Sequence, residues 1–295
     1  MGALLRTRPG VALQTQVGIE RARGRPYDPD RLNRFELLAD ALKRNPVEFR
    51  AEAARGWKNI AFFDAYFSNY IEGTEFDVDQ AAAVIFEGRI MQDRPKDSHD
   101  ILGTYQVTSD HGAMKTTPET FENFVRLIKR RHLTLFAQRT EINAGEFKTE
   151  VNRAGDTVFV HPDLVGGTLL RGFDLYKALE PGFERAAYIM FLVSEVHPMV
   201  DGNGRLSRLF MNAELVSNSQ SQILIPTVYR DDYLLTLRRL SREDDPLPFI
   251  SMMARAHRFT AMIDFSDYTQ AKAQLAERNA FRESHEGILR MPGSR

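Results

Sequence analysis

The chain has 295 residues, 43% of them hydrophobic and 27% charged, so it can bury one large core or two modest ones. Its formal net charge is -1, which gives no overall basic field for nucleic acid, and its lack of cysteine excludes disulfides, thiolate zinc sites and a cysteine nucleophile. No apolar run approaches the roughly 18 residues of a membrane-spanning helix, and no signal peptide is expected. We therefore expect a cytoplasmic protein.

The N-terminal region separates into an arm and a helical framework. Residues 1–28 mix glycine, proline and arginine, which is typical of either a loosely held arm or a basic arm that binds a partner. Apolar residues then recur at helical spacing. The helices expected within residues 29–110 cover 29–56, 59–72, 77–89 and 100–108.

The helix expected over 59–72 ends on a carboxylate. Asn59 suits its N-cap and Gly73 suits its C-terminal end. Ser68 and Glu72 lie one helical turn apart and share a face. Glu72 sits at the negative end of the helix dipole, where a carboxylate is unfavourable by about 0.3–1 kcal/mol unless a cation meets it. Glu72 is therefore either a solvated glutamate or one held for an arginine elsewhere.

Residues 147–160 interrupt the helical pattern that a helix over 119–135 continues. Two β-prone segments flank a glycine-containing loop at 152–156, which predicts a β-hairpin. A lone hairpin in a helical protein is either a surface decoration or a functional flap that adds its edge to an extended peptide. Gly166-Gly167 is expected to end the hairpin region. A short helix over 173–179 should follow it, and residues 261–295 should form a C-terminal helix and tail.

A strongly apolar segment after Pro181-Gly182 predicts a buried central helix that ends before Pro198. A new helix then begins at the glycines of the stretch His197-Pro198-Met199-Val200-Asp201-Gly202-Asn203-Gly204-Arg205-Leu206-Ser207-Arg208. Arg205 and Arg208 share its polar face. Free backbone N–H groups and the positive dipole end join them, so the segment predicts an anion site.

This stretch holds the groups needed to transfer a nucleotide to a hydroxyl. His197 can take a proton at neutral pH, and Asp201 beside phosphate oxygens is the usual protein share of a Mg²⁺ site. Base, metal ligand and anion nest together suit in-line displacement. The stretch is not a P-loop, which needs a preceding strand and a Gly-Lys-Ser/Thr ending, and it has no second histidine at zinc-ligand spacing. The other six histidines are scattered, and we assign them structural roles.

The same stretch resembles the signature of the Fic (filamentation induced by cyclic AMP) family, His-x-Phe-x-Asp/Glu-Gly-Asn-Gly-Arg-x-x-Arg, and the likeness covers roughly residues 55–260. It departs at Met199, where the family usually has phenylalanine, another apolar filler. The resemblance implies a mainly α fold: a helical bundle, with its core over 111–260, and a β-hairpin flap over the active site. It also implies transfer of AMP from ATP, with Mg²⁺, to a Ser, Thr or Tyr hydroxyl of a target protein.

The resemblance assigns roles residue by residue. His197 is the base and Asp201 holds Mg²⁺, while Arg208 holds the γ-phosphate. The other phosphate-binding residues are Gly202, Asn203, Gly204 and Arg205. The flap residues that align the target main chain are Val158, Phe159 and Val160, and those near the adenine are Tyr233 and Leu234. Ser241 stands where a relative often has asparagine, which leaves that contact undecided.

A second motif, Ser68-Asn69-Tyr70-Ile71-Glu72-Gly73, resembles the inhibitory signature Ser/Thr-x-x-x-Glu-Gly/Asn of the family's second class, which lies N-terminal to the core. In that class the glutamate pairs with the second motif arginine and blocks a productive γ-phosphate pose. The corresponding pair here is Glu72 and Arg208. The resemblance therefore implies an autoinhibited protein adenylyltransferase, with Ser68, Glu72 and Gly73 as inhibitory residues of a helix over 59–73.

Two alternatives stay open at this level. Within the family, related enzymes transfer UMP, phosphocholine or phosphate, or remove AMP; the intact Gly202-Asn203-Gly204 disfavours the phosphotransferase branch. Outside it, a non-catalytic interaction module that binds ATP would keep the same motif. The sequence names neither the target protein, which could be the chain itself, nor the oligomeric state. We expect no nucleic-acid or membrane partner.

Overall fold

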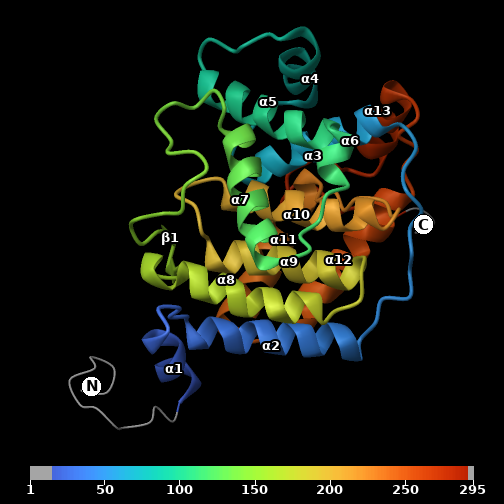
Figure 1. The fold of residues 1–295 in the computed structure, drawn as a ribbon. Coiled ribbons are helices and arrows are strands. Elements are labelled where there is room, and N and C mark those ends of the chain that lie inside the picture. The colour runs from blue at the N-terminus through green and yellow to red at the C-terminus, as the bar shows by residue number, and fades with distance from the viewer. Residues whose placement is uncertain (1–14, 292–295) are drawn as a thin grey trace, which may run out of the picture.

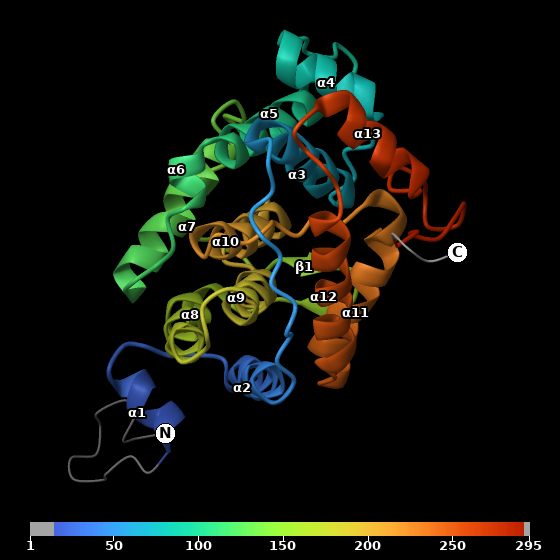
Figure 2. The same cartoon turned by 90° about the vertical axis from the view of Figure 1, so that its right-hand side faces the viewer.

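A computed structural model describes residues 15–291, which contain thirteen α-helices, one 3-10 helix and one two-stranded antiparallel sheet. The apolar helix α9 (Phe183–Val196) packs against α10 (Asn203–Ser217) at the centre, and other helices surround this pair in Figure 2. The loop between α9 and α10 carries the motif that starts at His197. The expected mainly α fold is confirmed, and its two central helices present the motif.

Three groups of helices cover the central pair (Figures 1 and 2). On one side lie α2 (Pro29–Arg44) and α8 (Pro162–Lys177). On the opposite side, α3 (Trp57–Ile71), α5 (Pro95–Ser109) and α7 (Phe121–Leu135) pack in sequence against one another, with α3 and α7 also on α10. On a third side α11 (Arg230–Glu243) packs on α12 (Leu247–Ala261). The remaining helices are α1 (Gln16–Ala22), α4 (Val78–Glu87), α6 (His111–Met114), η1 (Thr227–Tyr229) and α13 (Tyr268–Glu277).

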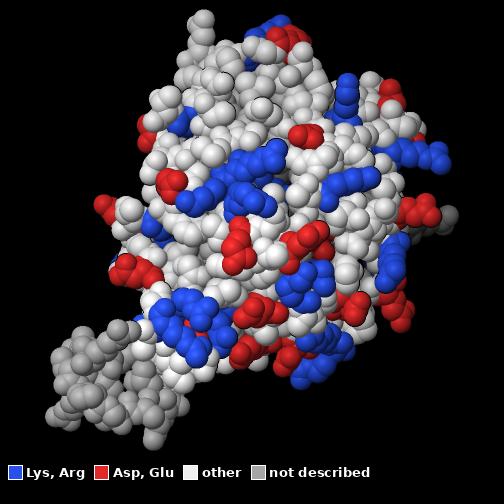
Figure 3. All heavy atoms as spheres, viewed as in Figure 1, with Lys and Arg blue, Asp and Glu red and all other residues white. Residues whose placement is uncertain are grey.

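One continuous hydrophobic core joins these helices. It includes side chains as distant in sequence as Phe63 of α3, Phe191 of α9 and Leu275 of α13. Within the described residues, no helix is both long and apolar enough to cross a membrane. Figure 3 shows Lys and Arg gathered near the middle of one face, with acidic groups close by, so neither sign dominates that face.

The arm expected over 1–28 is wrong for its described part. Residues 16–22 form α1, and Glu20 is buried and pairs with Arg23 and Arg25, so this part of the segment is folded. Residues 1–14 lie outside the described residues. Helix α2 also ends earlier than expected, at Arg44, because Asn45 precedes a proline, and such residues resist the helical region.

Helix α3 ends as predicted and starts differently. Gly73, with φ 94°, follows Glu72 at its C-terminal end. Its N-cap is Gly56, so the predicted Asn59 cap is wrong, and the Asn59 amide instead donates to the Phe265 carbonyl at 2.8 Å. This contact ties the start of α3 to the chain after α12.

The hairpin is narrower than predicted. Its strands are β1 (Arg153–Ala154) and β2 (Thr157–Val158), and residues 147–151 lie outside them. The expected end at Gly166-Gly167 is also wrong, as is a separate helix over 173–179, because α8 runs from Pro162 through Lys177. A Cβ at residue 167 would lie 2.1 Å from the Pro26 carbonyl oxygen, so this glycine serves close packing rather than helix termination.

Candidate active site

His197 follows the last residue of α9 and adopts the left-handed conformation, with φ 53° and ψ 58°. This region is costly for a residue with a side chain, by about 1–2 kcal/mol, and neighbouring contacts must hold it. Pro198 follows directly and stops α9 from continuing. The chain therefore turns sharply at His197 before α10 begins.

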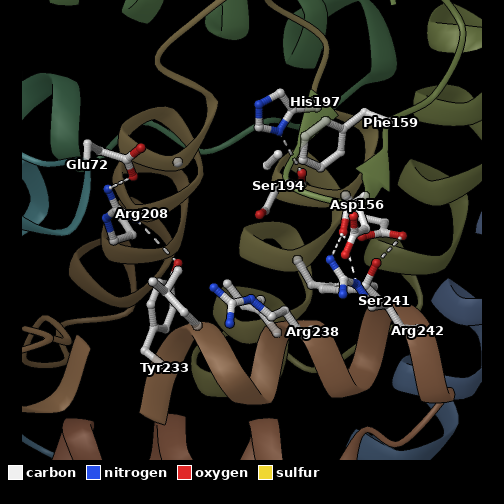
Figure 4. Close-up of a pocket in the computed structure, with 18 residues that line it drawn as sticks. Glu72, Asp156, Phe159, Ser194, His197, Arg208, Tyr233, Arg238, Ser241 and Arg242 are labelled. Atoms are coloured by element: carbon white, nitrogen blue, oxygen red, sulfur yellow. Dashed lines mark hydrogen bonds and ion pairs between the residues drawn. The ribbon is translucent and has the colours of Figure 1, made fainter. Parts of the chain in front are cut away.

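The imidazole of His197 has a defined tautomer. Its Nδ1 lies 3.1 Å from the Ser194 carbonyl oxygen, which can only accept, so Nδ1 carries the proton and Nε2 keeps its lone pair. Figure 4 shows the second ring nitrogen turned away from Ser194. The Phe159 ring stacks on the imidazole face, with centroids 3.7 Å apart and planes 8° apart, and leaves the ring edge as the reactive side.

Burial lowers the pKa of His197 to about 4. The hydrogen bond to the Ser194 carbonyl acts in the opposite direction, the Lys148 ammonium lowers the value further, and Glu72 and Asp201 raise it. The imidazole is therefore neutral at physiological pH. A neutral imidazole with a free Nε2 is the form that a general base requires.

The N-terminus of α10 holds a carboxylate from another helix. A Cβ added to Gly204 would lie 2.2 Å from Glu72 Oε1, so the Glu72 carboxylate rests directly over the first turn of α10. This is the place where free N–H groups and the helix dipole favour an anion. Glu72 thus occupies the anion site that the sequence predicts for a phosphate.

Arg208 is fully engaged with α3 and α11. Its Nη2 lies 2.6 Å from Glu72 Oε1 and 2.8 Å from the Ser68 carbonyl oxygen, and its Nε donates to Ser68 Oγ at 2.9 Å. Its Nη1 reaches the Tyr233 hydroxyl at 3.4 Å. Although burial raises the pKa of Glu72, the Arg208 and Arg205 charges bring it below the ordinary value. The pair is ionised, and the side chain of Glu72 remains 34% exposed.

Arg205 points elsewhere. Its Nη1 lies 2.8 Å from Asp100 Oδ2 of α5, and its guanidinium packs over the Phe136 ring. Asp100 also binds Arg139 at 2.8 Å. Arg205 is buried and does not line the cavity beside His197. In this conformation it joins α5 to the start of α10.

The rest of the motif supports its own loop. The Asn203 side chain accepts from the Met199 N–H and donates to the Met199 carbonyl, both at 2.9 Å. Asp201 is exposed, and its carbonyl lies 3.1 Å from His132 Nε2. His132 Nδ1 accepts the Gly145 N–H at 2.9 Å, which places the His132 proton on Nε2, facing Asp201. The sequence suggests only a structural role for His132. In the structure, its Nε2 holds the main chain at Asp201, the candidate metal ligand.

A cavity of about 510 Å³ lies beside His197 and Arg208. His197, Gly204, Arg208 and Glu72 line one part of it, and α11 lines another (Figure 4). Most of its lining residues come from α9, α10, α11 and the hairpin turn. The predicted residues that line it are Glu72, Phe159, His197, Gly204, Arg208, Tyr233, Leu234 and Ser241. The predicted residues that do not line it are Ser68, Gly73, Val158, Val160, Asp201, Gly202, Asn203 and Arg205.

Several residues at the cavity carried no local sequence signal. Glu195 is buried, lies in its wall, and accepts from Ser241 Oγ at 3.0 Å and Arg31 Nη1 at 3.0 Å. Arg238, on α11, also lines the wall (Figure 4). Arg31 comes from α2, more than 160 residues before Glu195 in sequence. Only the packing of α2 on α9 reveals this contact.

The helical bundle thus presents a neutral histidine beside an anion-binding helix N-terminus, with the hairpin next to it. Residues 121–215 match the profile of the Fic/DOC family. This match lies on the segment that holds the motif, and the resemblance inferred from the motif is confirmed.

Known relatives extend this likeness beyond the motif. The chain is 28% identical over 236 residues to the protein adenylyltransferase Fic of Drosophila persimilis, covering 77% of this chain and 45% of that protein. It is 24% identical over 207 residues to the protein adenylyltransferase fic-1 of Caenorhabditis briggsae, covering 68% and 40%. The chain thus spans less than half the length of these curated relatives.

Solved structures show the same fold. A fragment of Fic-1 from C. elegans superposes with a TM-score of 0.57 at 18% identity, covering 85% of this chain and 72% of that one. A Fic-domain signalling protein from Bacteroides thetaiotaomicron gives a TM-score of 0.55 at 20% identity, with coverage of 88% and 96%. The shared fold therefore extends well outside residues 121–215.

Proposed function

We propose that the chain transfers AMP from ATP to a Ser, Thr or Tyr hydroxyl of a protein target and releases pyrophosphate. One observation carries the proposal: a neutral His197 with a free Nε2 shares a cavity with an anion site built from the α10 N-terminus and Arg208. The curated Drosophila relative is named a protein adenylyltransferase, which supports AMP as the transferred group.

The proposed chemistry assigns a task to each part of the site. His197 Nε2 accepts the proton of the target hydroxyl, and the hydroxyl oxygen forms a bond to the α-phosphorus of ATP. The bond between that phosphorus and the bridging oxygen breaks, and pyrophosphate leaves. The α10 amides and Arg208 bind the phosphate oxygens, which offsets their charge. The flap residues beside Phe159 are proposed to hold the target main chain.

Asp201 is the motif carboxylate that suits a metal. Among residues 15–291, no cluster of three or more histidine or acidic side chains could hold an ion alone. Asp201 is exposed in the loop before α10, and a single carboxylate that shares an ion with substrate phosphates and water fits Mg²⁺ chemistry. We therefore propose that Asp201 holds Mg²⁺, which would neutralise phosphate charge when bound.

We also propose that the Glu72–Arg208 pair restrains the enzyme. The carboxylate lies over the α10 N-terminus and takes an Arg208 nitrogen at 2.6 Å, so a phosphate would have to displace both contacts. Ser68 binds the same guanidinium through Oγ and its carbonyl, so α3 holds Arg208 at three points. Release of Glu72 would open the anion site and leave Ser68 in place.

Replacement of Glu72 by glycine tests the proposed AMP transfer and the proposed restraint. We expect Glu72→Gly to raise labelling of the chain or of a target by α-labelled ATP by about 10-fold or more, because the phosphates no longer compete with a bound carboxylate. Addition of His197→Ala should abolish the labelling, since the hydroxyl then lacks its base. Autoradiography of both variants beside the unmodified chain gives the measurement. Equal labelling of Glu72→Gly and the unmodified chain would refute the restraint.

The open alternatives have separate tests. Competition of unlabelled ATP, UTP, GTP and CTP with the labelled nucleotide identifies the preferred nucleobase. Removal of AMP is tested by incubating labelled protein with the unmodified enzyme, which retains Glu72, and following loss of the label. Calorimetric titration of Glu72→Gly with ATP and Mg²⁺ separates an enzyme from a binding module. Tight binding without labelling of any protein would favour the module.

A further inference from the structure

His197 is held in its left-handed conformation by a residue far away in sequence. The main-chain N–H of Lys148 donates to the Pro198 carbonyl oxygen at 2.9 Å. The Lys148 ammonium donates to the Val196 carbonyl oxygen at 3.5 Å. One residue therefore binds the carbonyl groups on both sides of His197.

Asn152 extends these contacts by one residue. Its Oδ1 accepts from the Lys148 ammonium at 2.6 Å, and its Nδ2 donates to the Met199 carbonyl oxygen at 2.9 Å. Its own carbonyl accepts the Phe159 N–H at 3.2 Å. The carbonyl groups of residues 196, 198 and 199 are thus fixed by two residues at the base of the hairpin, and Asn152 also binds Phe159, which directly follows β2.

The burial of Lys148 argues for a specific role. The residue is only 5% exposed, although a lysine normally keeps its ammonium in water. An apolar side chain of similar length would fill this space without the cost of desolvating a charge. The charge is instead directed at the Val196 carbonyl and at Asn152, next to the imidazole whose proton affinity it lowers.

We propose that Lys148 and Asn152 form a positioning clamp, which fixes the main chain around His197 and thereby the direction of its Nε2. The clamp does not touch the reacting atoms; it acts through the backbone of residues 196–199. Because it joins this backbone to the hairpin, the flap and the base are held in one arrangement. The proposal rests on the proposed role of His197 as the base, and deepens it.

A first experiment does not depend on enzymatic activity. The imidazole of His197 is followed by NMR over pH and identified by the signal that His197→Ala loses. Lys148→Met keeps the length of the side chain and removes its donors and charge. We expect it to raise the His197 pKa, and to speed amide exchange over residues 196–204 by about 10-fold or more. Glu72 and Asp201, which also act on this imidazole, are unchanged.

Lys129→Met is the matched control. Lys129 contacts Glu146 and the Phe147 ring, directly before Lys148, but its side chain is 36% exposed and lies outside the clamp. We expect it to change neither the titration nor the exchange. Asn152→Ala, in which Lys148 stays in place, should speed the same exchange by a smaller factor, and circular dichroism melting identifies any variant that fails to fold. Normal exchange over 196–204 in both Lys148→Met and Asn152→Ala would overturn the proposal.

A second experiment follows labelling in the Glu72→Gly background. Lys148→Met should lower kcat by about 10-fold to 100-fold while the calorimetric Kd for ATP changes less than about 2-fold, because misplacement of the base affects chemistry rather than nucleotide binding. Lys148→Arg, which restores a charged donor, should recover part of kcat. If Glu72→Gly itself labels nothing, the proposed function fails, and titration and exchange still decide the clamp. Equal kcat with and without Lys148 would overturn it.

Discussion

The proton affinity of His197 sets the pH range in which this residue can serve as a base. Its pKa lies near 4 because burial and the Lys148 charge disfavour the imidazolium. For an ordinary histidine with pKa 6.5, only about 3% would be neutral at pH 5. His197 should therefore remain a competent base well into the acidic range.

This difference predicts the pH profile. In the Glu72→Gly enzyme, kcat/KM for labelling should stay level from pH 8 down to about pH 5 and fall only near the His197 pKa of about 4. The Glu72 charge raises the imidazole pKa, and the glycine variant lacks this charge. Loss of Glu72 therefore cannot move the acid limb to higher pH. Calorimetric Kd values over the same range correct for protonation of ATP. An acid limb near pH 6.5 would contradict the buried, neutral His197.

The sequence identified the cavity residues that belong to a local motif. His197, Gly204, Arg208 and Glu72 lie together at the cavity, as the motifs indicated. Lys148 was missed because its partners are main-chain carbonyls about 50 residues away, and no spacing rule reports such a contact. The loop-bracing role of the Asn203 side chain was also not visible from its place in an anion motif.

At the scale of elements, α3 and α10 meet along a polar seam. Asp64 and Ser68 of α3 and Glu72, its C-cap residue, recur every four residues, so they share one face. They face Asn212 and Arg208 of α10: Asp64 Oδ2 accepts from Asn212 Nδ2 at 3.0 Å, and the other two bind Arg208. The sequence predicted the Glu72 end of this seam; the Asp64 end is visible only in the packed helices.

Asp64 makes this seam sensitive to pH. Burial raises the pKa of Asp64 to about 7, against 3.8 for the ordinary group, although Asn212 and Arg208 act to lower it. The folded chain therefore binds more protons than the unfolded chain between these values, and the stability that Asp64 contributes is lost as pH rises through about 7. At 1.36 kcal/mol per pH unit, and with the folded-state carboxyl half titrated at pH 7, the loss amounts to about 2 kcal/mol between pH 5 and pH 7.

Unfolding by urea tests this with Asp64→Asn, which keeps the size of the side chain and cannot titrate. The unfolding free energy of the unmodified chain minus that of the variant should fall as pH rises from 5 to 8. Asp79→Asn is the control, because Asp79 is an exposed carboxylate paired with Lys272. A difference for Asp64→Asn that does not vary with pH would show that the buried carboxyl does not titrate in this range.

For the whole molecule, the Fic/DOC match covers residues 121–215, and the site draws on segments far outside it. Glu72 comes from α3, Tyr233 from α11 and Arg31 from α2. Periodicity predicted helices at α2 and α3 but none over 230–243, and the apolar character of α9 predicted which helix lies at the centre. Pairing between helices depends on contacts distant in sequence, and periodicity holds no information on such contacts.

Arg31 connects the outer helix layer to the flap. Its Nη2 donates to the Val158 carbonyl oxygen at 2.6 Å, while its Nη1 lies 3.0 Å from the buried Glu195 carboxylate. Phe159 N–H bonds to Asn152, so the antiparallel alternation turns the polar groups of Val158 away from β1, toward the outer edge. Arg31 thus caps the free edge of the hairpin and ties it to α2 and α9.

Loss of this contact should loosen the flap. In Arg31→Ala, we expect amide exchange over residues 153–160 to rise by about 10-fold, because β2 keeps only its short pairing and the contact of Arg242 with Thr157 Oγ1. Arg34→Ala is the matched control: Arg34 also reaches Glu195, at 3.4 Å, but its other partner is Asp244 rather than the flap. Exchange measured by mass spectrometry should therefore rise in the first variant alone. An equal rise in both would mean that neutralisation of Glu195, and not the cap on Val158, holds the hairpin.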